Sequence, residues 1–173
     1  MVYEDFNVQN IIADQLVAQG FFEIMNNSLT TAQYETLSED IQPAQRVTLL
    51  NPLSQDLAVM RQSMLFSGLE TIAYNNNRKR TDLALFEFGK TYHRIGDNFE
   101  EPKHLTLFLT GNVYPEMWNA PTQRTNFYYL KAYIMRILER LGIKEVVESP
   151  TDESVFQEGI QLSLGKIHLA SLG

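Results

Sequence analysis

The sequence predicts an α+β domain in which an antiparallel sheet is flanked by helices. Apolar residues recur at the spacing of an amphipathic helix in residues 4–19 and 126–141. Residues 83–92 and 105–110 instead alternate with a period of two, which is typical of β-strands. A turn at residues 95–98 lies between these two strands, and we expect them to pair antiparallel.

The first predicted helix covers residues 4–19 and ends at Gly20. Its apolar face consists of Val8, Ile11, Ile12 and Leu16. Val17 lies on the opposite side, which indicates either that a second structure covers the helix or that one apolar residue is exposed. Residues 21–28 follow as a predicted strand.

Residues 30–46 are polar, and we expect a short helix or loop there. Residues 47–50 are predicted as a short strand that enters a turn at Asn51 and Pro52. The turn is expected because a proline ring disfavours the helical conformation of the residue before it.

Ser63 is predicted to cap the next helix, which ends near residues 75–78. The side of this helix that we expect to face the sheet carries Leu65, Leu69, Ile72 and Ala73. The strand at residues 83–92 is apolar on both faces, which indicates an interior strand.

Residues 112–125 contain several prolines and are expected to form an irregular connection. Asn126 is predicted to cap the clearest amphipathic helix of the chain, and Gly142 is predicted to terminate it. Lys131 lies at the edge of its apolar stripe, where the stem either covers the core with the amine in water or pairs inside a buried interface. Short strands are expected from residue 146 onward.

Length and composition are those of a soluble globular domain. The chain has 173 residues, of which 44% are hydrophobic and 20% charged, so residues 1–173 are expected to form a single domain. No apolar run approaches the roughly 20 residues of a membrane span. The acidic first residues do not resemble a signal peptide, and the absence of cysteine fits a reducing compartment. We therefore expect a cytoplasmic protein without membrane contact.

The charge balance disfavours an extended nucleic-acid surface. Fourteen Lys and Arg residues stand against 21 Asp and Glu residues, which gives a net charge of −7. The one basic cluster, Arg78-Lys79-Arg80, follows a predicted helix end. Its cations either complement the helix dipole or contact RNA or a partner chain.

Sequence motifs for catalysis and metal binding are missing. His93, His104 and His168 lack the short spacings of zinc sites, and there is no cysteine to join them. No phosphate-binding glycine loop or nucleophile elbow occurs. Glu100 and Glu101 are adjacent, so a strand would direct them to opposite faces, and we expect both in a solvated loop. We therefore assign no catalytic, cofactor-binding or metal-binding residue.

Several motifs occur in a fixed order: Asn-Pro-Leu-Ser at residues 51–54, Met-Arg-Gln-Ser-Met-Leu at 60–65, Asn-Asn-Asn-Arg at 75–78 and Leu-Phe-Glu-Phe-Gly-Lys at 85–90. Their order and spacing resemble the catalytic-like core of the phenylalanyl-tRNA synthetase β subunit. Further similarity lies at residues 20–24, 126–131 and 167–173, which extends the resemblance over nearly the whole chain. The sequence departs from the family at Phe66, where proline is common, and at Ala132, where glycine is usual.

The resemblance implies a fold like that of class II aminoacyl-tRNA synthetases, and it implies that residues 1–173 are an excised, C-terminally truncated segment of a longer chain. Residues 4–28 correspond to the first class II signature motif, which implies a subunit interface at Val8, Ile11, Ile12, Leu16 and Val17. Residues expected to hold the fold are Asn51, Pro52, Arg61, Glu87, Gly89 and Lys131. We expect Arg61 and Glu87 to form a partly buried ion pair that links the turn to the strand.

The resemblance also implies a structural, non-catalytic module of a phenylalanine–tRNA ligase. Its partners would be the α subunit and, through the full complex, tRNA(Phe). ATP and magnesium would be bound by the full ATP-dependent complex and not by this segment, which we expect to be inactive alone.

We expect inactivity because arginines that class II adenylation needs are missing from the sequence. These arginines hold the α-phosphate of ATP in line with the carboxylate of the amino acid. His93 stands at the nearest position to the arginine of the second signature motif, and period-two geometry directs Arg94 to the other face. The glycine-rich third signature motif, with its own arginine, is absent.

Two alternatives remain at this point. One is a divergent adenylating enzyme that uses Arg94 and Arg61 on ATP. The other is a nucleic-acid-binding module that uses Arg78, Lys79, Arg80 and Trp118.

Overall fold

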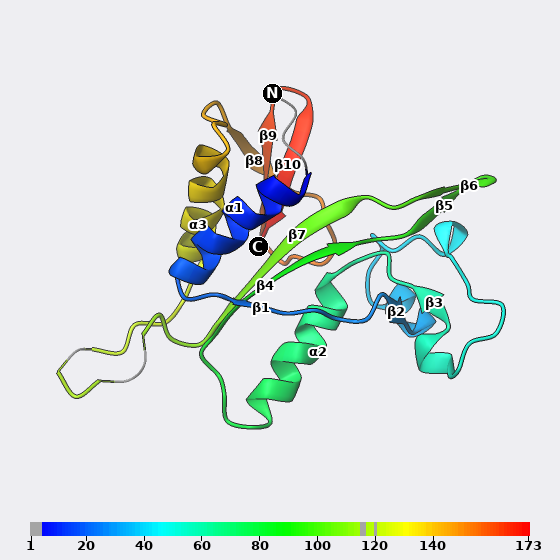
Figure 1. The fold of residues 1–173 in the computed structure, drawn as a ribbon, viewed down its shortest axis with the longest axis horizontal. Helices are drawn as coiled ribbons and strands as arrows, with labels where there is room; N and C mark the ends of the chain where they lie inside the picture. Colours follow the sequence, from blue (N-terminus) through cyan, green and yellow to red (C-terminus); the bar gives the residue numbers. More distant parts are fainter. Residues whose placement is uncertain (1–4, 115–116, 120) are drawn as a thin grey trace.

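The computed structural model describes residues 5–114, 117–119 and 121–173, and Figure 1 shows their arrangement. The helices are α1 (Asp5–Ala18), α2 (Leu65–Asn76) and α3 (Phe127–Arg140), with short 3-10 helices η1 (Ala32–Thr36), η2 (Pro43–Gln45) and η3 (Gln55–Leu57). The strands are β1 (Phe22–Glu23), β2 (Leu29–Thr30), β3 (Val59–Met60), β4 (Leu83–Lys90), β5 (His93–Ile95), β6 (Asn98–Glu100), β7 (Lys103–Thr110), β8 (Val147–Pro150), β9 (Ile160–Leu164) and β10 (Ile167–Leu172).

The main sheet has the strand order β1-β4-β7. β4 and β7 pair antiparallel from Leu83–Thr110 to Lys90–Lys103, which confirms the pairing predicted from the sequence. β1 pairs with β4 in parallel and is only two residues long, so the strand predicted at residues 21–28 is wrong in its extent. The chain leaves the sheet after Ile24 because the backbone N–H of Asn26 donates to the Glu87 carboxylate and not to a strand carbonyl.

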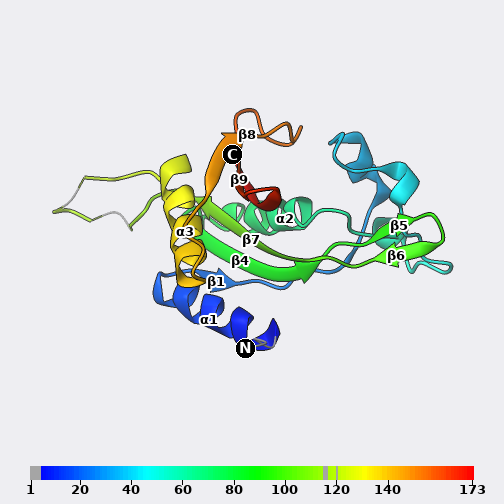
Figure 2. The same cartoon turned by 90° about the horizontal axis from the view of Figure 1, so that it is seen from above.

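Helices cover both faces of this sheet, and Figure 2 shows α1 and α2 on opposite sides of β4 and β7. On the α1 side, Phe86 packs with Ile12 and Leu16 of α1 and with Ile137 of α3. Leu85, Glu87 and Phe108 lie on the other face, and all three are buried. The prediction that β4 is an interior strand is therefore confirmed.

The predicted sheet-facing side of α2 is wrong for two of its four residues, whereas Leu65 and Ile72 are half-buried. Leu69 and Ala73 are exposed, whereas Gly68 is buried against the ring of Phe108. The contact side runs through Met64, Gly68 and Thr71, because small and polar residues leave room for the Phe108 ring and for the polar groups beside Glu87.

Both glycines predicted as helix stops have that role. Gly20 has φ +91°, and the N–H groups of Gly20 and Phe21 donate to Val17 and Leu16, each at 3.0 Å. Gly142 has φ +80° and the same pair of bonds at the end of α3. A residue with positive φ followed by this bonding pattern is a Schellman motif. Glu4, the first residue of the predicted helix, lies outside the described residues.

The N-terminal caps are less uniform. The side chain of Asn126 accepts hydrogen bonds from the N–H groups of Tyr128 and Tyr129, which confirms it as the cap of α3. The cap position of α2 is Met64, one residue after the predicted Ser63. Ser63 still accepts the Leu65 N–H at 3.2 Å, so its hydroxyl stabilises the start of the helix.

The strand predicted at residues 47–50 is reduced to a bridge between Thr48 and Val59. The Leu49 N–H donates to the Ala58 carbonyl at 3.0 Å and closes a hairpin whose loop contains Asn51 and Pro52. The strand is short because the chain bends at residue 50 and exposes its side chains beyond that point.

The C-terminal strands form a separate sheet of order β10-β9-β8, as expected from residue 146 onward. Leu162 and Leu172 pack with Leu138 of α3 to form a second core cluster. The predicted irregular connection before α3 is described only in part, because Pro115 lies outside the described residues. In the part of the chain that the structure describes, no helix is long and apolar enough to cross a membrane.

Candidate functional site

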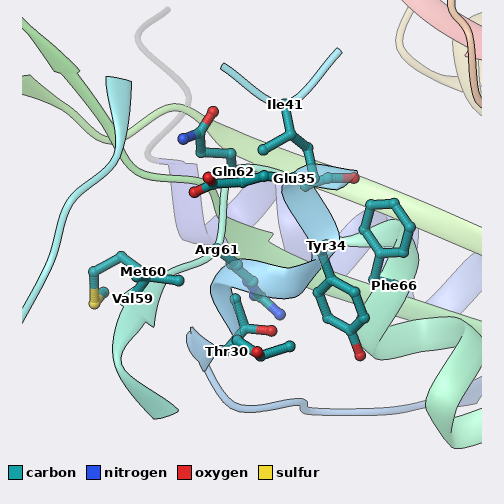
Figure 3. A pocket seen from close by; sticks show the side chains of 11 residues that line it. Thr30, Tyr34, Glu35, Ile41, Val59, Met60, Arg61, Gln62 and Phe66 are labelled. Atoms are coloured by element: carbon teal, nitrogen blue, oxygen red, sulfur yellow. The ribbon is translucent and has the colours of Figure 1, made fainter. Parts of the chain in front are cut away.

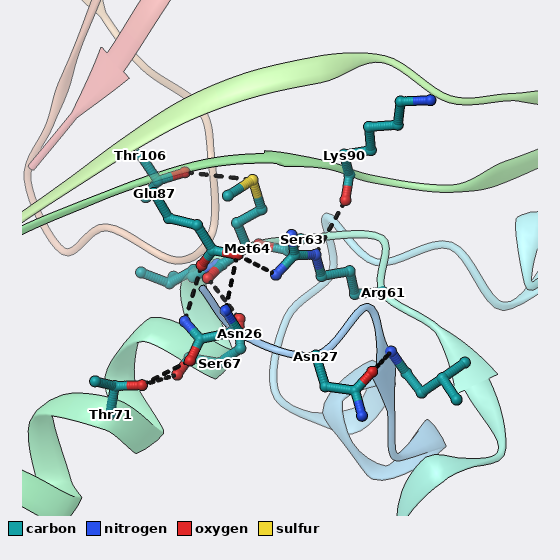
Figure 4. Close-up of polar contacts among 12 residues, drawn as sticks. Asn26, Asn27, Arg61, Ser63, Met64, Ser67, Thr71, Glu87, Lys90 and Thr106 are labelled. Atoms are coloured by element: carbon teal, nitrogen blue, oxygen red, sulfur yellow. Dashed lines mark hydrogen bonds and ion pairs between the residues drawn. The ribbon is translucent and has the colours of Figure 1, made fainter. Parts of the chain in front are cut away.

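A polar cluster lies between β4 and α2, and it consists of the buried Arg61 and Glu87 and the half-buried Asn26 and Thr71 (Figure 4). Arg61 Nη1 lies 2.9 Å from Glu87 Oε1, and the side chains are only 4% and 2% exposed. The ion pair expected from the sequence is present, and it is fully rather than partly buried. We call these four residues the Arg61 cluster.

The carboxylate of Glu87 is satisfied on both oxygens. The backbone N–H of Asn26 donates to Oε1 at 3.2 Å, and its side-chain amide donates to Oε2 at 2.8 Å. The Thr71 hydroxyl donates to the side-chain Oδ1 of Asn26 at 2.7 Å and so holds the side-chain amide with its nitrogen toward Glu87. A charge removed from water requires such partners, because an unpaired buried carboxylate is costly.

Gly89 provides the space for the guanidinium of Arg61. A Cβ at Gly89 would lie 2.2 Å from Arg61 Nη2. Arg61 Nε also donates to the Lys90 carbonyl at 3.0 Å, so both ends of the guanidinium are held by β4. Three residues that the sequence analysis selected, Arg61, Glu87 and Gly89, therefore meet at one place.

The cluster joins segments that are distant in the sequence. Asn26 and Glu87 are 61 residues apart, and Arg61 and Glu87 are 26 residues apart. The donors and acceptors bind one another, and the two charged members, Arg61 and Glu87, are buried, so neither charge is free to bind a substrate. Its chemistry is that of a structural link.

Sequence reasoning did not identify Asn26 and Thr71. Their signal was indirect: a buried carboxylate offers about four lone-pair sites, and even a bidentate arginine fills only two of them, so further donors are expected. A polar residue just after the neighbouring strand was the place to look for a second donor.

The other selected residues lie elsewhere. Asn51 is exposed in the hairpin loop, between Leu50 and Leu53, which are almost fully exposed. Pro52 is half-buried in the same loop. Lys131 pairs with Glu148 at 2.7 Å and links α3 to β8 as a partly exposed ion pair, so it is not a buried interface pairing within this chain.

The interface candidates divide by burial. Ile12 and Leu16 are buried in the core of this chain, so they are not available to a partner. Val8 and Ile11 are half-buried, and Val17 is 58% exposed. An open groove of about 600 Å³ runs along α1 and α3 and is lined by Ile11, Asp14, Gln15, Arg136, Glu139 and Arg140.

His93, which the sequence analysis compared with the arginine of the second signature motif, is held by two hydrogen bonds. His93 Nδ1 lies 3.1 Å from Gln45 Oε1, and His93 Nε2 lies 3.0 Å from the Thr91 hydroxyl. Arg94 is exposed, and its Nε donates to the Gly96 carbonyl at 3.0 Å. Arg61 and Arg94 therefore lie in different environments: Arg61 is buried beside β4, and Arg94 is exposed on the β5–β6 hairpin.

A small cavity lies beside the Arg61 cluster, next to η1 (Figure 3). Its volume is about 20 Å³, which is room for about one water molecule and not for an amino acid or a nucleotide. The ring of Tyr34 stacks on Phe66 at 4.6 Å, and its hydroxyl donates to Glu70. Burial, followed by this hydrogen bond, raises the pKa of Tyr34 to about 12.

Among residues 5–114, 117–119 and 121–173, no group of three or more His, Cys, Asp or Glu residues could hold a metal ion.

The model of one protein family, described as the phenylalanyl tRNA synthetase beta chain CLM domain, matches residues 3–173. The chain belongs to this family. The phenylalanine–tRNA ligase beta subunit of Bacteroides thetaiotaomicron is 43% identical over 179 residues, which cover 96% of this chain and 22% of that protein. The same subunit of Bacteroides fragilis is 46% identical over 145 residues, which cover 79% of this chain and 18% of that protein. This CLM domain therefore spans about a fifth of the length of these relatives.

Solved structures support the fold assignment. A pyrrolysyl tRNA synthetase from Desulfitobacterium hafniense superposes with a TM-score of 0.68 at 20% identity, over 96% of this chain and 55% of that chain. An ATP phosphoribosyltransferase regulatory subunit/histidyl-tRNA synthetase from Bacillus halodurans C gives a TM-score of 0.63 at 17% identity, over 84% and 36% of the two chains. The CLM domain thus has the α+β fold of class II aminoacyl-tRNA synthetases, as the sequence resemblance implied. It is a class II-like module of the β-subunit family.

Proposed function

We propose that this CLM domain is a structural, non-catalytic part of a phenylalanine–tRNA ligase. In this proposal it assembles with the α subunit and supports the α-chain active site, where the complete, ATP-dependent ligase aminoacylates tRNA(Phe). ATP and magnesium are bound by the complex and not by this domain. The work takes place in the cytoplasm, where we place the domain by its resemblance to translation enzymes.

The main support for a non-catalytic role is that no arginine is free to bind ATP at the two positions considered, those of Arg61 and His93. Adenylation requires an arginine fork that is free to hold the α-phosphate of ATP. Arg61 is instead bound to Glu87, and the site nearest to the required arginine holds His93, whose ring contacts Gln45 and Thr91. The cavity beside Arg61 accommodates about one water molecule. The chain thus keeps the fold and lacks a free arginine at either place.

The surface for the α subunit is proposed to be the groove along α1 and α3 together with Val17. The groove presents the half-buried Ile11 between charged residues of both signs, an arrangement that suits a partner helix with an apolar centre and a polar rim. Val17 does not line the groove; it is a separate apolar residue on another side of α1, where it is 58% exposed.

Size-exclusion chromatography with light scattering tests this proposal. The domain is measured alone and mixed with the α chain of the same source, and co-elution in a defined ratio is the expected result. Val17→Asp is expected to abolish co-elution. The matched control is Val147→Asp, because Val147 is also 58% exposed but lies on β8.

Two results would contradict the proposal. One is co-elution that Val17→Asp and Val147→Asp leave equally intact, which would exclude the α1 surface. The other is ATP–pyrophosphate exchange with phenylalanine by the CLM domain alone, lost in Arg94→Ala, which would show adenylating activity.

A further inference from the structure

Two segments that the sequence separates meet at one end of the main sheet. They are the turn between α2 and β4 and the connection between β7 and α3, and we call the described residues 111–114, 117–119 and 121–125 of that connection the arm. Asp82 Oδ1 accepts the Asn112 N–H at 2.9 Å, and the Thr110 hydroxyl donates to the Thr81 carbonyl at 2.7 Å. The arm projects from the body of the domain at this end (Figure 1).

The base of the arm is a hydrogen-bonded ladder. The Val113 N–H donates to the Gln123 carbonyl at 2.8 Å, and the Thr125 N–H donates to the Gly111 carbonyl at 2.9 Å. Beyond this ladder, Trp118 is 99% exposed and Tyr114 is 65% exposed. The hydrogen bonds at the base of the arm thus hold a segment whose two large aromatic side chains are exposed and do not pack in the core of this chain.

The adjacent turn supplies cations that the fold does not use. Arg78 is engaged, because its guanidinium lies 3.4 Å from the centre of the Tyr74 ring and its Nη1 donates to the Tyr74 carbonyl. Among the described residues, Lys79, Arg80 and Arg124 enter no ion pair. The acid in this turn, Asp82, has its Oδ1 oriented toward the Asn112 N–H. All three unpaired cations are exposed, and two of them follow the end of α2 directly.

We propose that Lys79, Arg80, Arg124, Tyr114 and Trp118 form an RNA-binding surface for unpaired nucleotides. Phosphates would bind to the cations, and a base would stack on Trp118. This inference rests on the proposed function, in which the domain works inside a tRNA ligase.

RNA fits this surface better than a protein does. Unpaired cations beside exposed aromatic rings are the means by which proteins hold single-stranded nucleic acid. Protein interfaces are depleted in lysine but enriched in arginine and aromatic residues, so composition alone does not decide; the three cations that, among the described residues, enter no ion pair are what favours phosphate. The net charge of −7 restricts the contact to a few phosphates, because the overall field of the chain opposes a larger one.

The test uses the ligase assembled from the full-length β chain and its α chain, and the probe is a tRNA(Phe) transcript titrated at several salt concentrations. Trp118→Ala is expected to weaken binding about 5- to 150-fold, the range that corresponds to loss of one stacked base. Lys79→Asn with Arg80→Gln is expected to lower the slope of log affinity against log salt by about 0.7 for each lost phosphate contact. Asparagine is chosen at residue 79 because Lys79 has φ +61°, a conformation that asparagine tolerates.

Matched controls lie on other parts of the surface. Phe99→Ala removes an exposed aromatic ring from the β5–β6 hairpin at the opposite end of the sheet. Lys144→Gln with Lys166→Gln removes two exposed cations, one between α3 and β8 and one in the turn between β9 and β10. Both controls are expected to bind tRNA as the wild-type ligase does.

The proposal is overturned if Trp118→Ala, or the double cation variant, binds tRNA like the wild-type ligase. It is also overturned if either variant fails to assemble with the α chain, since the arm would then be a protein interface. A failure of the first kind leaves the co-elution of the CLM domain with the α chain untouched, so it is separable from a failure of the proposed function.

Discussion

Removal of the Arg61 side chain is expected to destabilise the domain strongly. In Arg61→Ala, the Glu87 carboxylate stays buried with the Asn26 donors but without a counter-ion. Breaking a buried pair in this way costs about 3–5 kcal/mol. With an unfolding entropy of about 2.1 cal/mol/K per residue, a chain of 173 residues loses about 3 °C for each kcal/mol. The melting temperature should therefore fall by about 8–14 °C.

Differential scanning calorimetry measures this change, and a second pair on the same strand supplies the control. Lys90 pairs with Glu101 at 2.8 Å, but both side chains are about half exposed. Lys90→Ala should melt close to the wild-type temperature, because water screens an exposed pair. The reasoning is refuted if Arg61→Ala also melts within about 3 °C of wild type, which corresponds to 1 kcal/mol.

A double variant distinguishes the contribution of the Arg61–Glu87 charges from the contribution of the volume that the two side chains fill. Arg61→Met with Glu87→Leu replaces both charges by apolar groups, which is often tolerated in buried pairs. Here the Asn26 donors lose their acceptor, so only part of the stability should return. The double variant should still be more stable than the sum of the single changes implies, and strict additivity would indicate that the two side chains do not interact.

Two other substitutions test the surroundings of the cluster. Gly89→Ala should lower the urea midpoint by the equivalent of about 1–3 kcal/mol, because the added methyl group would lie 2.2 Å from Arg61 Nη2 and 2.6 Å from Met64 Cε; an unchanged midpoint would contradict this. Partial burial, followed by the charges of His93 and Arg61, lowers the pKa of His104 from its ordinary value of 6.5. The folded chain therefore binds this proton less readily than the unfolded chain, so stability holds above about pH 6.5 and is lost as the pH falls toward the lowered pKa. His104→Gln should flatten the fall of the urea midpoint between about pH 7 and about pH 5, and a slope equal to that of wild type would exclude His104 as its cause.

Elements with local signals were predictable from the sequence. α3 has a continuous apolar stripe, an asparagine cap and a glycine stop, and all three are found where the pattern placed them. The pairing of β4 with β7 follows from the short connection between them. In both cases the determining residues lie within a few turns or one hairpin of one another.

Elements that depend on distant partners were not predictable in the same way. A count of apolar residues selected Leu69 and Ala73 on α2, but the side that meets the sheet is determined by Phe108, which needs Gly68 opposite its ring. The parallel pairing of β1 with β4 has no local sequence signature, because two residues carry no period. Within the Arg61 cluster, the motif residues were identified and Asn26 was missed, since an asparagine after a strand resembles an ordinary turn residue.

The long separation within the Arg61 cluster also affects synthesis of the chain. Asn26 and Glu87 are 61 residues apart, which corresponds to roughly 3–12 s of translation at 5–20 residues per second. During this interval α1 has been made, but Phe86 and Ile137, which cover its apolar face, have not. The apolar face of the nascent α1 is therefore without these two partners during this interval. Synonymous codon changes between residues 26 and 87 should thus alter the yield of soluble protein without altering the stability of the finished domain.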